Sequence, residues 1–165
     1  MISIVHAGPE DIQTIQNLAR KIWPATYAEI LSSDQLEYML RLIYSHKALT
    51  AQMIEADHVF YLAIKDEEPV GFISLAKNSD DPTIFELNKI YVLPEMQGAG
   101  IGLTLLDFAK NAAIEKGGKT LQLNVNRNNK AVHFYRKNGF DILREEDINI
   151  GKGYFMNDYV MSTEV

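Results

Sequence analysis

The 165-residue sequence contains no cysteine. This absence excludes disulfide bonds, thiolate metal sites and cysteine nucleophiles, and it removes any evidence about redox compartment. No stretch approaches the roughly 20 consecutive apolar residues that a membrane-spanning helix needs. The first residues also lack the basic and apolar segments of a secretion signal. A cytoplasmic protein without a membrane partner is therefore expected.

Positive charge is in deficit as well. The chain has 16 Lys and Arg residues against 22 Asp and Glu residues, a net charge of -6. Nucleic-acid surfaces depend on an excess of Lys and Arg, so no nucleic-acid partner is expected, and the acidic charge fits a cationic small molecule better. The 4 histidines lie far apart without metal-ligand spacing, so no metal site is expected and they are interpreted as surface or packing residues.

What is present is the composition of an ordinary globular protein. Hydrophobic residues make up 47% and charged residues 23% of the chain. No internal repeat, low-complexity run or long linker divides it. We therefore expect a single domain over residues 1–165, long enough to bury a core without metals or disulfides.

The first third of the chain predicts a strand followed by helices. Residues 2–6 read as a strand, and Pro9 opens a helix with a regular apolar face. Pro24 is expected to end or kink this helix. Ser32 is the predicted N-cap of a second helix, and residues 47–55 predict a short third one.

The rest alternates between extended and helical segments. Three extended segments separated by tight turns predict an antiparallel meander. A long helix ends near Lys116, and a strand, a short helix and two final strands follow. The expected ranges are strands at 58–65, 70–77, 83–93, 120–126, 140–145 and 153–161, with the short helix at 128–137.

The run Gln97-Gly98-Ala99-Gly100-Ile101-Gly102 opens the long helix. It lacks the Lys-Ser/Thr pair of a P-loop. It also fails the dinucleotide fingerprint, whose third glycine would fall at Leu103. Glycines at the start of a helix can still aim backbone N–H groups at an anion. The alternative is a turn that merely brings a strand and a helix close together.

This run resembles the Q/R-x-x-G-x-G/A signature of the GCN5-related N-acetyltransferases (GNAT family). A second block, VNRNNKAVHFYRKNGF at residues 125–140, is similar to a later motif of the same family. The resemblance implies an α/β fold whose mixed, mostly antiparallel sheet has six to seven strands and helices on both faces. It also implies a V-shaped splay between the fourth and fifth strands, and, because family members often dimerise, a homodimer.

The ligand that the resemblance implies is acetyl-coenzyme A. Its pyrophosphate would lie on the glycine-loop amides, and its pantetheine arm would pair with the third meander strand like an added strand. Either Asn128 or Asn129 would approach the cofactor, with Asn129 favoured. The cofactor-binding residues implied in this way are Ile90, Tyr91, Val92, Gln97, Gly98, Ala99, Gly100, Ile101, Gly102, Leu103, Asn124, Asn129 and Tyr135.

Two catalytic roles follow from the resemblance. An alkylamine is almost wholly protonated at neutral pH, so acetyl transfer to it needs a base. Glu86 matches the position of a family glutamate that serves as this base; the alternative is an exposed strand residue or a partner for Lys89. Tyr135 matches the tyrosine that protonates the departing thiolate, and the alternative is an aromatic buried against the sheet.

The acceptor is expected to be a small primary amine. The segment IWPATYAEILSSDQLEYML resembles a branch similar to bacterial spermidine/spermine acetyltransferases, which makes a polyamine the first candidate. Trp23 and Tyr27 would then form an aromatic wall around an ammonium group; core packing is the commoner role for aromatics in such a segment, and these two are the best exceptions. A protein N-terminus, a peptide lysine, an amino sugar and a non-catalytic acyl-coenzyme A sensor are the alternatives.

Overall fold

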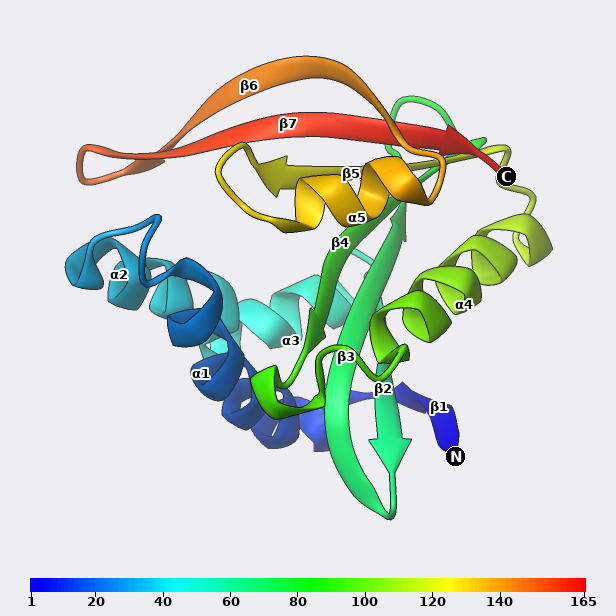
Figure 1. Cartoon of the computed structure of the whole chain (residues 1–165), viewed down its shortest axis with the longest axis horizontal. Coiled ribbons are helices and arrows are strands. Elements are labelled where there is room, and N and C mark those ends of the chain that lie inside the picture. Colours follow the sequence, from blue (N-terminus) through cyan, green and yellow to red (C-terminus); the bar gives the residue numbers. More distant parts are fainter.

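The computed structural model describes residues 1–165 and is built on one mixed sheet of seven strands (Figure 1). The strand order is β1-β2-β3-β4-β5-β7-β6. Every neighbouring pair is antiparallel except β4 and β5, which are parallel. The predicted mixed, mostly antiparallel sheet is therefore confirmed.

The elements follow the predicted order along the chain. The strands are β1 (Ile2–Ala7), β2 (Val59–Lys65), β3 (Glu68–Lys77), β4 (Ile84–Val92), β5 (Thr120–Asn126), β6 (Asp141–Gly151) and β7 (Tyr154–Glu164). The helices are α1 (Ile12–Tyr27), α2 (Ser33–Tyr44), α3 (His46–Ile54), α4 (Ile101–Glu115) and α5 (Ala131–Lys137), with short 3₁₀ turns at Pro9–Asp11 and Pro94–Met96. None of these helices is both long and apolar enough to cross a membrane.

Local side-chain chemistry accounts for the start of α2. Ser32 is its N-cap, and the hydroxyl accepts a hydrogen bond from the backbone N–H of Gln35 at 3.1 Å. This satisfies one of the amides that a helix leaves free at its first turn. The predicted cap is therefore confirmed.

Pro24 was expected to end or kink α1; the helix does not end there, because it continues to Tyr27, and the kink stays a prediction. Pro24 lacks an N–H, but the turn after it is still closed by the bond from the Ala28 N–H to the Pro24 carbonyl, 3.0 Å long. The side chains of Trp23 and Tyr27 are both buried on this turn. Tertiary packing thus outweighs the local cost of a proline within a helix.

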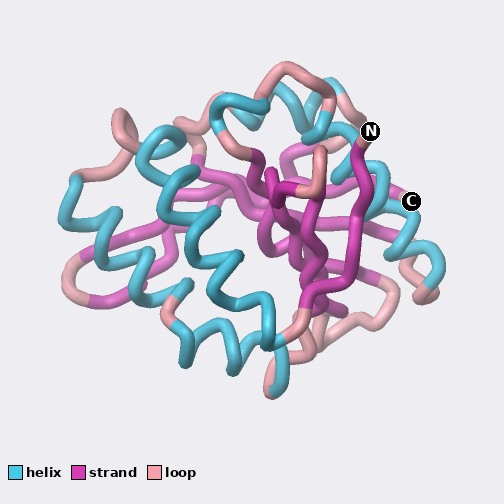
Figure 2. The backbone as a smooth tube through the Cα atoms, turned by 90° about the horizontal axis from the view of Figure 1, so that it is seen from below, coloured by secondary structure: helices cyan, strands magenta, loops and turns pink.

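The sheet separates two hydrophobic cores. One lies between the sheet and α4 and α5, and contains Leu105, Leu121 and Phe140. The other lies beneath α1, α2 and α3, and contains Ile15, Leu40 and Leu49. Figure 2 shows helices packed along the strands in the view from below. The expected helices on both faces are confirmed.

The sheet opens between β4 and β5. Only three residue pairs join them, from Ile84 with Thr120 to Glu86 with Gln122. On its other side β4 carries a bulge, since Ser74 pairs with Lys89 whereas Leu75 pairs with Leu87. A bulge bends its strand and increases the local twist. The predicted splay between the fourth and fifth strands is confirmed.

The close approach of β3 to β4 depends on Gly71. A Cβ atom added there would lie 2.6 Å from the backbone oxygen of Tyr91. We expect Gly71→Ala to lower the free energy of unfolding by about 1–3 kcal/mol through overpacking, as measured by urea unfolding. Gly102→Ala is the control, since its new Cβ would meet only Phe134 at 3.8 Å. A helical Gly→Ala change usually stabilises by about 0.5–1 kcal/mol, so equal losses in both variants would contradict this account.

Candidate functional site

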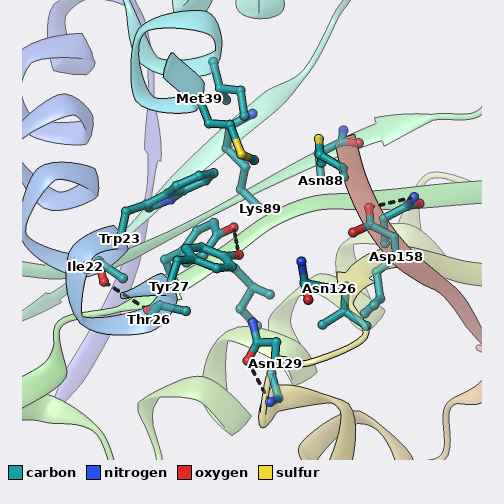
Figure 3. A pocket seen from close by; sticks show the side chains of 18 of the residues that line it. Ile22, Trp23, Thr26, Tyr27, Met39, Asn88, Lys89, Asn126, Asn129 and Asp158 are labelled. Carbon is teal, nitrogen blue, oxygen red and sulfur yellow. Dashed lines mark hydrogen bonds between the residues drawn. The ribbon is translucent and has the colours of Figure 1, made fainter. Parts of the chain in front are cut away.

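A cavity of about 410 Å³ occupies the opening between β4 and β5. Its lining comes from α1, α2 and α3 on one side and from β5, β7 and the start of α5 on the other, with β4 running through it (Figure 3). Segments far apart in the sequence therefore meet in one concave, largely apolar site. Sites of this kind commonly bind small molecules.

The free edge of β4 is the first functional feature of this cavity. Pairing with β5 stops at Glu86, so the backbone of 87–92 has no strand beside it on that side. Ile90, Tyr91 and Val92 line the cavity, as expected of the predicted cofactor edge. Unpaired strand backbone can hydrogen-bond an extended ligand in the manner of an added strand.

The glycine loop follows β4 directly. Gly98 has φ +87° and Gly100 has φ +81°, and an added Cβ would meet no atom within 4 Å at either position. These glycines are needed for backbone conformation rather than for space. Left-handed residues in a short loop make successive N–H groups converge, and the start of α4 adds its positive end. The loop can therefore hold an anion.

The loop and the cavity are continuous through Gln97. This residue lines the cavity, and its Nε2 donates to the Val92 carbonyl at 3.3 Å. The residues from Gly98 to Leu103 do not line the cavity. They follow Gln97 along the chain and lead into the first turn of α4.

Tyr135, on α5, lines the cavity and is buried. Burial raises the pKa of its hydroxyl, so the group stays protonated at neutral pH and can act as a proton donor. Asn129 also lines the cavity, whereas Asn128 does not. The Asn129 side-chain oxygen accepts from the Ala131 N–H at 2.9 Å, which fixes the start of α5.

An aromatic wall closes the α1 side. The hydroxyls of Tyr27 and Tyr91 lie 3.0 Å apart in a hydrogen bond, drawn beside Tyr27 in Figure 3. The Trp23 ring centroid lies 4.7 Å from that of Tyr27 and 5.8 Å from that of Tyr91. Burial raises the pKa of both tyrosines. The predicted acceptor residues Trp23 and Tyr27 thus line the same cavity as Tyr135.

Glu86 is the one predicted catalytic residue that the structure does not bring to the cavity. It lies where β4 and β5 are still paired, and it is absent from the cavity lining. Its carboxylate accepts a hydrogen bond from Asn78 Nδ2 at 3.0 Å. The role of Glu86 as general base therefore stays a prediction, without support from this arrangement.

Sequence reasoning missed Asp158, the only carboxylate in the cavity lining. It lies on β7, is 3% exposed and accepts a hydrogen bond from Asn124 Nδ2 at 3.3 Å. Burial raises the pKa of this carboxyl group. A carboxylate of this kind can bind an ammonium group and accept a proton from it. The available signal was an acidic residue within a strand segment, MNDYVM, whose other residues except Asn157 are apolar or aromatic.

Sequence reasoning also missed Lys89 as a site residue. Its side chain is buried in the cavity lining, and Nζ donates to Gln52 Oε1 at 2.6 Å. Burial lowers the pKa of this amine to about 8. His58 also lines the cavity. Burial, and then the charge of Lys89, lower the pKa of His58, which keeps its ring neutral at neutral pH.

Comparison with known proteins identifies the relatives of this chain. The pattern of the Acetyltransferase (GNAT) family matches residues 12–140. The chain is 34% identical over 146 residues to a spermidine N(1)-acetyltransferase of Thermoplasma acidophilum, covering 86% of this chain and 89% of the relative. It is 33% identical over 90 residues to the peptidyl-lysine N-acetyltransferase YjaB of Escherichia coli, covering 53% of each.

Among solved structures, the PaiA N-acetyltransferase of Thermoplasma acidophilum in complex with coenzyme A superposes with a TM-score of 0.83. Its sequence is 30% identical, and the match covers 100% of this chain and 99% of that one.

The burial of Lys89 predicts a pH-dependent stability. The pKa is about 8 in the folded chain against an ordinary 10.5, so between these values the unfolded chain binds more protons. The contribution of Lys89 to the free energy of unfolding should therefore rise with pH across this window, by about 3 kcal/mol. Lys89→Met should lose the rise, whereas Lys77→Met, at an exposed lysine, should keep it. Denaturant unfolding from pH 7 to 11 measures the three curves, and parallel curves for wild type and Lys89→Met would contradict the prediction.

Proposed function

The chain belongs to the GNAT family of acetyltransferases and is an acetyl-CoA-dependent N-acetyltransferase. From this premise we propose that it transfers the acetyl group to the primary amine of a small molecule, by direct attack within a ternary complex. The observation that carries the proposal is the single cavity in which the open β4 edge, Tyr135 and the wall of Trp23 and Tyr27 meet. Donor and acceptor can be held there side by side.

The chain's own residues fit the acetyl donor. The amides of the loop from Gly98 to Leu103 would hold the pyrophosphate, and the edge from Ile90 to Val92 would hold the pantetheine arm. Asn124 and Asn129 line the same opening. The Thermoplasma acidophilum neighbour was solved in complex with coenzyme A, which supports a coenzyme A thioester as the donor. When bound, the donor supplies a thioester carbonyl that an amine can attack.

The chemistry requires three actions of the protein. Alignment of the amine with the thioester supplies much of the rate by itself. A backbone N–H near Val92 stabilises the negative charge that develops on the acetyl oxygen. The Tyr135 hydroxyl, kept protonated by burial, donates a proton to the departing thiolate. No covalent intermediate with the enzyme is needed.

The amine must also lose a proton before or during attack. Glu86 is the candidate from the sequence, acting directly or through water. Asp158 is a second candidate, because its carboxylate lines the cavity and its raised pKa makes it a better base than an ordinary aspartate. Of these two carboxylates, Asp158 has the stronger geometric support.

The acceptor is proposed at two levels of detail. A small primary amine fits the enclosed aromatic wall. A polyamine-like amine is supported by the spermidine N(1)-acetyltransferase relative and by the net charge of -6. Acetylation of a peptide lysine or N-terminus is a weaker alternative, because the E. coli lysine acetyltransferase matches only 53% of this chain. Cytoplasmic location and homodimer formation stay predictions.

A thiol-release assay tests the proposed function. Purified protein and acetyl-CoA are mixed with polyamines, monoamines, amino acids, aminoglycosides and peptides, and free coenzyme A is measured. Release with at least one small amine supports the proposal. Acetyl-CoA binding in calorimetry without release on any acceptor would instead indicate a sensor, and preferential binding of dinucleotides would contradict the donor site.

If Tyr135 is the proton donor, its replacement should lower turnover without weakening acetyl-CoA binding. Tyr135→Phe should lower turnover about 10²- to 10⁴-fold, because the thiolate loses its proton donor. The dissociation constant for acetyl-CoA should change little, since the ring is kept. Steady-state kinetics and calorimetry measure the two quantities. Glu86→Gln is made in parallel, and an unaltered pH–rate profile for it would remove Glu86 from the mechanism.

If the glycine loop binds the donor, a change in it should weaken acetyl-CoA binding without weakening amine binding. Gly100 has a left-handed backbone that valine rarely adopts. Gly100→Val should therefore raise the dissociation constant for acetyl-CoA by about tenfold or more. The Michaelis constant for the amine, measured at saturating acetyl-CoA, should stay close to that of the wild type. A variant that loses acceptor affinity and keeps donor affinity would contradict the assignment of the loop.

A further inference from the structure

One end of the cavity holds hydrogen-bond donors that have no acceptor. The indole Nε1 of Trp23 and the hydroxyl of Tyr44 are buried without a hydrogen-bond partner. Burial raises the pKa of Tyr44, and the neighbouring Trp23 indole N–H lowers it by a smaller amount. The geometry of this contact does not reach that of a hydrogen bond. Lys89 Nζ has one partner, Gln52. Trp23, Tyr44 and Lys89 are 3%, 4% and 6% exposed, and all three line the cavity.

This cluster is fixed by its surroundings. Gln52 donates its own amide to the Ile43 carbonyl at 2.9 Å, which turns its oxygen toward Lys89. The Lys89 ammonium lies 5.7 Å from the Tyr44 ring centroid and 5.3 Å from that of Phe60. Because buried polar groups are normally hydrogen-bonded, unpartnered donors around a held cation indicate a place for an anionic ligand group.

The charges in the cavity support this interpretation. Lys89 takes part in none of the ion pairs of the chain. With His58 neutral, Lys89 and Asp158 are the only charged side chains in the lining. They come from β4 and β7, which are separated by β5 in the sheet, and Figure 3 shows them on different sides of Asn88. The cavity thus carries one positive and one negative charge on separate strands.

We propose that the acceptor is a zwitterion, a primary amine that also carries a carboxylate. Its carboxylate binds to Lys89, at the end of the cavity that Trp23 and Tyr44 also line, and its amine lies at Asp158. This inference rests on the proposed acetyl transfer and names its acceptor class. The bound ammonium first gives one proton to Asp158. The C–N bond then forms as the thioester C–S bond breaks, the thiolate takes the proton of Tyr135, and the second nitrogen proton restores the Tyr135 hydroxyl.

A polyamine matches these charges less well. It carries two or more ammonium groups and no anion, so one cation would face the buried Lys89 without compensation. The single carboxylate of the lining could neutralise only one of its charges. The cavity therefore favours a different small amine from the one that the sequence resemblance favours.

Matched acceptors test the proposal in the thiol-release assay. 5-Aminopentanoate, pentylamine and 1,5-diaminopentane share one carbon chain and differ only in the group at the far end. Shorter and longer chains and α-amino acids are included to match the spacing of the cavity. We expect kcat/KM for the best amino-carboxylate to exceed that for the diamine of the same length by about tenfold or more.

Variants then test Lys89 itself. Lys89→Met should abolish or reverse the preference for the amino-carboxylate over the diamine, and Tyr44→Phe, which keeps the ring, should reduce it. Lys77→Met, a lysine outside this cavity, is the matched control and should keep the wild-type ratio. Circular dichroism and thermal unfolding establish that each variant is folded, and the Tyr44 variant carries the test if Lys89→Met does not fold.

The outcomes separate this inference from the proposed function. A preference of the wild type for the diamine overturns the zwitterion and leaves acetyl transfer standing. An amino-carboxylate preference that Lys89→Met and Tyr44→Phe both retain overturns the assigned carboxylate position. Acetyl-CoA binding without release on any amine overturns the proposed function, and the inference with it.

Discussion

The parting of β4 from β5 is the constraint on which the rest of this structure depends. Two parallel strands that stay paired over their full length leave no room for a ligand. Here pairing ends after three residue pairs, and the bulge at Leu87 to Lys89 turns the remaining strand away. One backbone edge is thereby left free in the middle of a sheet, where the hydrophobic cores on both faces hold it in place. Such an edge within a packed scaffold can bind an extended ligand with little loss of conformational freedom.

The same bulge decides which side chains of β4 face each side of the sheet at the cavity. Leu87 belongs to the core under α4, whereas Tyr91 packs on the core under α1 and α2. The extra residue shifts the alternation of β4, so that Lys89 points to Gln52 on α3 rather than into the other core. The burial of this lysine costs stability, as its lowered pKa indicates. Groups that cost stability in this way are frequent at functional sites.

Much of the fold could be predicted because its signals are local. Ser32 caps a helix through its own hydroxyl, and Gly98 and Gly100 have the left-handed conformation that their residue type favours. The predictions that failed depended on distant contacts. Pro24 does not end α1 because Trp23 and Tyr27 are buried there. The last two strands run to Gly151 and Glu164, beyond the predicted ends, because they pair with each other along a hairpin rich in polar residues.

The sequence by itself determined the order of elements, the glycine loop that starts α4, the position of Tyr135 after it, and hence the family. These properties reside in short segments, where residue type acts on the neighbouring backbone. Only the tertiary structure decided which charged groups share the cavity. Glu86 is hydrogen-bonded to Asn78 outside the cavity. Asp158 on β7, 72 positions later in the sequence, lines the cavity instead. That outcome depends on strand order and register, since a side chain's neighbours across a sheet are set by pairing between distant segments.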